Sequence, residues 1–138
     1  MEFRKILVPV SGTEADEEAM KLACRLAKKD KGRIWSVYVV TIKRALPLDT
    51  EIESGIETAE AILDHIEMVA EEQDCEIETD VLQAREVGPA IIDEAVEREV
   101  DLILMGAKYK RRFGQFSLGS VAPYVLQNSL CPVILYHQ

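Results

Sequence analysis

The chain has 138 residues, 48% of them hydrophobic and 30% charged, so we expect a single domain over residues 1–138 with a buried core. Its formal net charge of −9 at pH 7 argues against general nucleic-acid binding, because a phosphate backbone requires a basic face. No apolar run approaches the roughly 18 residues of a membrane-spanning helix, and the N-terminal apolar stretch is too short for a signal peptide.

Hydrophobic periodicity predicts strands and helices in strict alternation along the chain. Apolar or β-branched runs predict five strands, at residues 4–10, 33–40, 76–84, 101–106 and 131–137. Apolar residues spaced three or four apart predict four helices between them, at about residues 14–31, 51–73, 88–99 and 119–128. This alternation is typical of crossover connections, so it predicts an α/β fold with an open, mostly parallel five-stranded sheet and helices on both faces.

The sequence also marks helix ends and sheet edges. Thr13 followed by Asp16 predicts a capping box at the start of the first helix, and Gly32 is expected to end that helix. The third strand is the most polar, which suits a sheet edge, whereas the fourth is apolar and is expected at the centre. Ligands of such sheets bind beyond the carboxyl ends of the strands, so the loops after the first, second and fourth strands are candidate sites.

The segment between the fourth strand and the last helix, residues 105–120, is unusually basic for this acidic chain. Four of the sixteen Lys and Arg residues fall within five positions: Lys108, Lys110, Arg111 and Arg112. Gly106 would let a ligand approach the backbone at the strand end, and Gly119-Ser120 would open a helix whose first N–H groups can bind phosphate. No Walker pattern occurs. A solvated turn remains the alternative on these features alone.

Other residue patterns point less clearly to chemistry. The acidic residues of the first helix are more typical of partners of the helix dipole than of metal ligands, and His65 and His137 lack Cys or His partners at ligand spacing. No catalytic triad or water-activating base can be nominated, so we expect at most slow hydrolysis of a bound ligand. Three cysteines beside apolar-periodic segments indicate reduced thiols in a cytoplasmic protein.

Two other five-stranded α/β classes fit the sequence poorly. A phosphoacceptor receiver domain needs carboxylates after the first and third strands, and "VPVSG" and "LQARE" do not supply them there. A flavodoxin-like domain needs a phosphate loop after the first strand, which "SGTEAD" resembles weakly. Phe113 and Phe116 either fold the basic segment onto the domain or face a partner.

Three segments are similar to those of a known family. They are "RKILVPVSGTEADEEAMKLACRLAK", "VGPAIIDEAVEREVDLILMG" and, most specifically, "GSVAPYVLQNSLCPVILY". The chain resembles the universal stress protein domain over essentially its whole length. The resemblance implies the adenine nucleotide alpha hydrolase-like strand order 3-2-1-4-5 and a homodimer through the fifth strand. It also implies a stress-response sensor or regulator that binds ATP or another adenine nucleotide, optionally with Mg²⁺ on the phosphates.

One branch of that family binds ATP through a loop written G-x2-G-x9-G-[ST]. Here Gly106 and Gly119-Ser120 match its ends, whereas Tyr109 stands at the second glycine and Ser11 stands where the family usually has Asp. By position, the resemblance implies adenine and ribose contacts from Pro9, Val10, Ser11, Val39 and Met105, and phosphate contacts from Gly106, Gly119, Ser120 and Val121. On the ground of their charge, apart from the motif, we add Lys108 and Arg111 as candidate phosphate contacts. The alternative is an interaction module without nucleotide, whose basic loop docks a partner.

Overall fold

The computed structural model describes residues 2–107, 110–112, 115–117 and 119–137. Its main sheet has five parallel strands in the order β3-β2-β1-β4-β7. These strands are β3 (Glu78–Ala84), β2 (Arg33–Thr41), β1 (Lys5–Pro9), β4 (Leu102–Ala107) and β7 (Val133–His137). The predicted order 3-2-1-4-5 is confirmed. The fifth strand is numbered β7 because a separate hairpin, β5 and β6, precedes it in the chain.

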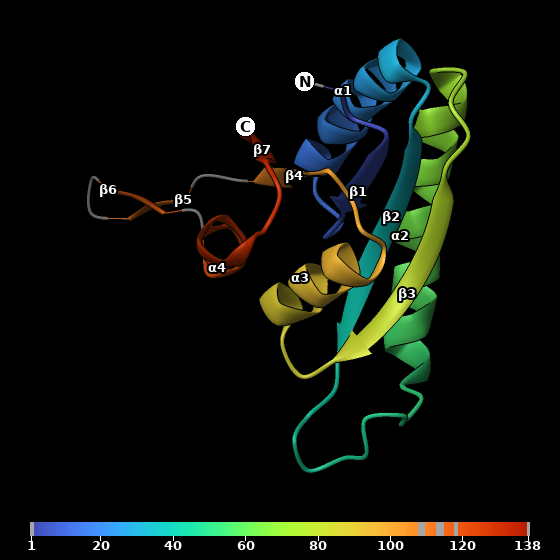
Figure 1. The fold of residues 1–138 in the computed structure, drawn as a ribbon. Coiled ribbons are helices and arrows are strands. Elements are labelled where there is room, and N and C mark those ends of the chain that lie inside the picture. The colour runs from blue at the N-terminus through green and yellow to red at the C-terminus, as the bar shows by residue number, and fades with distance from the viewer. Residues whose placement is uncertain (1, 108–109, 113–114, 118, 138) are drawn as a thin grey trace.

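Helices cover both faces of the sheet, as the sequence predicted. The described residues form α1 (Glu14–Asp30), α2 (Glu53–Glu72), α3 (Val87–Glu97) and α4 (Val121–Asn128). Helices α1 and α2 lie on one face and α3 and α4 on the other (Figure 1). Ile6 and Val8 of β1 are buried in the first core and Leu7 in the second, which explains the continuous apolar run of this strand. Within the described ranges, every helix is too short or too polar to cross a bilayer.

Both ends of α1 lie where the sequence predicted them. The capping box is confirmed, and the Asp16 carboxylate accepts the N–H of Thr13 at 3.0 Å. At the other end, the helix stops just before Gly32, as predicted; the residue with a left-handed backbone is Lys31 (φ 55°), and the Gly32 N–H donates to the Ala27 carbonyl at 2.7 Å. A Cβ on Gly32 would lie 2.6 Å from the carbonyl oxygen of Phe3. Gly32 is therefore needed because the backbone before β1 packs directly against the turn into β2.

The edge strand β3 is secured by charged and aromatic contacts. The guanidinium groups of Arg33 and Arg98 lie over the Trp35 ring of β2, at 5.0 and 5.5 Å from its centroid. Glu78 of β3 accepts hydrogen bonds from Arg33 and from the Trp35 indole N–H, and these bonds lower the pKa of its carboxyl. The polar third strand is therefore an edge strand, as predicted.

Candidate functional site

The loop after β1 wraps around the carboxylate of Asp16 in α1. Its Oδ2 accepts the backbone N–H groups of Ser11 at 3.1 Å, Gly12 at 2.7 Å and Thr13 at 3.0 Å. Asp16 is only 2% exposed, and burial raises the pKa of its carboxyl although the three N–H bonds oppose that shift. Gly12 has a φ of +91°, which helps successive amides converge on one oxygen. The chain therefore fills this anion-binding turn with its own side chain.

Three predicted ligand contacts lie on neighbouring strands, near their carboxyl ends. Pro9 ends β1, which runs between β2 with Val39 and β4 with Met105. Val39 and Met105 belong to the apolar cluster beneath α3 and α4, and Val121 packs against it. Pro9 follows Leu7 of the same cluster by two residues and so lies on this face. Pro9, Val39, Met105 and Val121 therefore lie together on this face of the sheet, and we call them the apolar floor.

Val10 and Ser11 take different positions from this apolar floor. The Val10 side chain packs in the core beneath α1 and α2, on the opposite face of the sheet. Its N–H donates to the Val37 carbonyl at 2.9 Å, so any contact from Val10 to a ligand at the floor must come from its carbonyl group. Ser11 is exposed, and its N–H donates to Asp16.

Gly106 lies inside β4 rather than at its end. The strand continues through Gly106, which pairs with Tyr136, to Ala107, so the predicted strand end at Gly106 is wrong by one residue. A Cβ on Gly106 would lie 2.6 Å from the backbone carbon and oxygen of Ala15. Glycine is needed here because the first turn of α1 packs directly on the strand. Close approach of a ligand is not required to explain it.

Gly119 and Ser120 precede α4, which begins two residues later than predicted. Gly119 has a φ of +75°, which L side chains rarely adopt, whereas a Cβ there would meet open space. Ser120 is the N-cap residue, and its carbonyl accepts the Tyr124 N–H at 3.4 Å. Both Gly119 and Ser120 are exposed. The glycine is therefore set by backbone conformation, on a turn that a ligand can reach.

A pocket of about 390 Å³ lies between the amino ends of α3 and α4, within the size range of small-molecule sites. Ser120 and Val121 line it, together with Tyr124. The remaining lining residues come from the start of α3: Glu86, Val87, Gly88 and Pro89. Sequence analysis missed the α3 residues. No sequence signal indicated them, because the reason for Gly88 is a contact across the fold: a Cβ there would lie 2.7 Å from the Tyr124 ring.

The basic segment contains an antiparallel hairpin where the sequence predicted a loop. Strand β5 (Lys110–Arg112) pairs with β6 (Gln115–Ser117), and Arg111 is opposite Phe116 in the register. The hairpin extends away from the main sheet (Figure 1). The predicted contact Lys108 lies outside the described residues, and Arg111 is placed by its backbone on this hairpin. The two predicted cation contacts therefore stay predictions.

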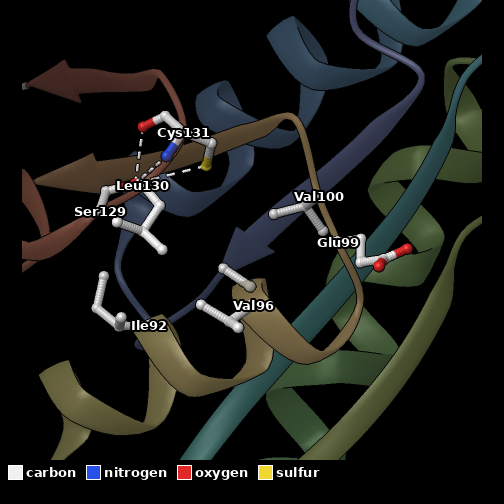
Figure 2. A pocket seen from close by; sticks show the side chains of 8 residues that line it. Ile92, Val96, Glu99, Val100, Ser129, Leu130 and Cys131 are labelled. Carbon is white, nitrogen blue, oxygen red and sulfur yellow. Dashed lines mark hydrogen bonds between the residues drawn. The ribbon is translucent and has the colours of Figure 1, made fainter.

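A second, apolar pocket of about 200 Å³ lies at the opposite end of the sheet (Figure 2). Ile92 and Val96 of α3 face Leu130, which is 88% exposed and precedes β7. The Ser129 hydroxyl donates to the Cys131 carbonyl at 2.7 Å and fixes this turn. Because the pocket borders the amino ends of β4 and β7, it is separate from the predicted ligand contacts.

Comparison with known proteins decides the family. The model of the universal stress protein family matches residues 2–137. This chain belongs to the universal stress protein family. Universal stress protein MJ0531 of Methanocaldococcus jannaschii is 30% identical over an alignment of 139 positions, which spans 96% of this chain and 81% of that relative. The resemblance inferred from sequence is confirmed.

Solved structures of other universal stress proteins have the same fold. That of Archaeoglobus fulgidus in complex with dAMP gives a TM-score of 0.77 at 23% identity, over 98% of both chains. Another, in complex with cAMP, gives 0.78 at 18% identity, over 99% of both chains. At these identities the likeness shows the fold of this universal stress protein alone, while both neighbours are complexes with adenine nucleotides.

Proposed function

We propose that this universal stress protein binds an adenine nucleotide at the carboxyl ends of β1, β2 and β4. The observation that carries the proposal is that the apolar floor adjoins the pocket between α3 and α4. Val87 and Val121 line this pocket and also pack on the cluster that contains Val39 and Met105. An apolar floor suits the base, and first-turn N–H groups suit a phosphate. The complexes of two structural neighbours with dAMP and cAMP support an adenine nucleotide.

The phosphate end of the ligand is expected at the start of α4. Ser120 supplies a hydroxyl and the first turn supplies N–H groups, so AMP, ATP and related nucleotides share this contact. The cations Lys108 and Arg111 of the basic segment would add to the binding of a longer phosphate chain. Mg²⁺ would be held mainly by phosphate oxygens, since the described residues hold no group of three or more His, Cys, Asp or Glu suited to a metal.

Occupancy of the site is the proposed means of regulation. A nucleotide whose phosphates contact the hairpin would favour one position of that hairpin and so change a surface seen by a partner. The cytoplasm is the proposed compartment, because the three cysteines are free thiols that a reducing environment preserves.

Replacing Gly119 with valine should weaken nucleotide binding by about tenfold or more while the protein stays folded. A β-branched residue at φ +75° strains the turn by about 1–3 kcal/mol, which displaces the start of α4. Calorimetry with ATP, AMP and cAMP measures the effect. Asn tolerates this backbone conformation, so Gly119→Asn is the matched control for strain and should bind more tightly than the valine variant. Unchanged affinity of the valine variant would place the phosphate elsewhere.

A second function is favoured by the projecting hairpin, which carries Lys110, Arg111 and Arg112. As an interaction module without nucleotide, the protein would dock an acidic partner through it. Mass spectrometry of the supernatant after denaturing the purified protein separates the two functions. Released nucleotide supports the first. No nucleotide, and no thermal shift with millimolar ATP, AMP or cAMP, supports the second.

A homodimer through β7 is proposed from the two edges of the sheet. The β3 edge carries Glu78 and Asp80, whereas β7 presents half-buried apolar residues along an edge without acidic side chains. Exposed apolar edges tend to pair with another strand. Light scattering during gel filtration should give twice the chain mass of 15.5 kDa. A monomer mass at micromolar concentration would contradict the dimer.

A further inference from the structure

A carboxylate lines the α3 side of the pocket between α3 and α4. It belongs to Glu86, the N-cap residue of α3, whereas Ser120, the N-cap residue of α4, lines the other side. Among the described residues, the ion-pair partner of Glu86 is Arg44, whose Nη2 lies 3.9 Å from Oε1, too far for a hydrogen bond. The Glu86 side chain is 64% exposed, so its oxygens are accessible to a ligand in the pocket.

We propose, resting on the nucleotide-binding function proposed for this chain, that Glu86 accepts hydrogen bonds from the ribose hydroxyl groups and so selects ribonucleotides over deoxyribonucleotides. With the base on the apolar floor and the phosphate at the start of α4, the ribose that joins them lies in the pocket. The 2′- and 3′-hydroxyl groups are on the opposite face of the ribose ring from the base and the 5′-carbon. They therefore face α3, where the two oxygens of one carboxylate can accept both.

The packing of α3 fixes the backbone of Glu86 relative to α4. Val87, the next residue, packs on the core beneath the two helices and lines the same pocket. A Cβ on Gly88 would lie 2.7 Å from the Tyr124 ring, so the start of α3 is in direct contact with α4. The helix dipole also favours a carboxylate beside the first turn of α3. The acceptor is therefore carried by a rigid wall of the pocket.

The loop between β2 and α2 brings a cation to the same wall. This loop extends beyond the carboxyl ends of β2 and β3 (Figure 1). Arg85, just after β3, holds the loop, since its Nη1 donates to the carbonyl groups of Lys43 at 2.5 Å and Leu46 at 2.8 Å. Arg44 lies between these two residues and beside Glu86. Its charge offsets that of the carboxylate, which would otherwise repel the nucleotide phosphate.

Calorimetric titration with AMP, 2′-deoxy-AMP and 3′-deoxy-AMP tests the recognition of ribose. The parent should bind AMP about tenfold more tightly than either deoxynucleotide, because each of these leaves one hydrogen bond to a charged acceptor unmade. In Glu86→Ala the three affinities should be nearly equal. Glu97→Ala is the matched control, since it removes the same charge from the exposed far end of α3, away from this pocket, and should keep the preference.

Arg44→Gln separates the charge at this wall from the recognition of ribose. It removes a cation and leaves the acceptor, so it should weaken AMP and 2′-deoxy-AMP alike, by about twofold at low salt. The preference for AMP should remain that of the parent. Because the pair of Arg44 with Glu86 is largely exposed, thermal unfolding of Arg44→Gln and Glu86→Ala should match that of the parent.

The outcomes distinguish failure of the ribose contact from failure of the nucleotide site. A parent that binds AMP but binds both deoxynucleotides as tightly overturns ribose recognition and leaves the site in place. The same holds if Glu86→Ala keeps the preference of the parent for AMP. A folded parent that binds none of the three nucleotides overturns both the ribose contact and the proposed function. Gly119→Val should weaken AMP and 2′-deoxy-AMP in proportion, because it acts on the phosphate end alone.

Discussion

Replacing Gly106 with alanine is expected to destabilise the protein by about 3 kcal/mol, at the upper end of the range for overpacking. The new methyl group would lie 2.6 Å from the backbone carbon and oxygen of Ala15, which cannot rotate away as a flexible side chain can. The first turn of α1 would have to move off β4, although both elements contribute fully buried residues to the core. Urea unfolding followed by circular dichroism measures the loss, and Gly106→Val should prevent stable folding.

Gly119→Ala is the matched control, because a Cβ at Gly119 meets open space. Its cost should be limited to the left-handed backbone, about 1 kcal/mol. The comparison separates two glycines that occupy equivalent places in the sequence motif. Gly106 is needed because α1 packs on β4, and Gly119 is needed because the turn before α4 has a positive φ. Equal losses in the two variants would show that the contact with Ala15 is not what requires glycine in β4.

The sheet could be predicted because its causes are local in the sequence. Ile6, Leu7 and Val8 are consecutive and all buried because β1 is covered on both faces, so their apolar run indicates a central parallel strand. Glu78 and Asp80 mark β3 as an edge strand for a similarly local reason. The strand order itself rested on resemblance to the family.

What could not be predicted depends on contacts between distant backbones. Gly32 and Gly106 were interpreted as a helix stop and a ligand approach, whereas each avoids a clash with a backbone remote in sequence. The pocket between α3 and α4 could not be predicted for the same reason, because the need for glycine at position 88 is evident only once Tyr124 lies beside it. The β5–β6 hairpin was missed because its strands are only three residues each and β5 consists entirely of cations. Local periodicity cannot detect strands that short.

Asp16 was interpreted in part as a partner of the helix dipole, and the structure gives it a larger role. Replacing Asp16 with alanine should cost about 2–4 kcal/mol, because the capping box of the helix loses its N3 carboxylate and the Ser11, Gly12 and Thr13 N–H groups lose their acceptor. Asp16→Asn keeps one carbonyl oxygen for these groups and should stay within about 1 kcal/mol of the parent. Urea unfolding of both variants at pH 7 tests this difference. An asparagine variant as unstable as the alanine variant would mean that the negative charge itself holds the loop.

The same variants bear on the proposed nucleotide site. With Asp16 in place, the amides of Ser11, Gly12 and Thr13 already have an acceptor and are not available to a phosphate. Nucleotide affinity should therefore be nearly the same in the parent and in Asp16→Asn, while Gly119→Val loses it. A marked loss of affinity in Asp16→Asn, with stability unchanged, would place the ligand at the loop after β1 instead of at the start of α4.

Titration separates the charge of Asp16 from its hydrogen bonds. Burial raises the pKa of this carboxyl in the folded protein above its ordinary value of 3.8, so the folded state binds the proton at a higher pH than the unfolded chain. The contribution of Asp16 to the free energy of unfolding therefore falls as pH rises from 3.8 to the folded-state pKa. As pH drops through the same range, the parent should become more stable relative to Asp16→Asn. Urea unfolding of both proteins between pH 7 and pH 4 measures the difference. If the parent instead loses stability relative to the asparagine variant, the three N–H bonds to the ionised carboxylate outweigh its burial.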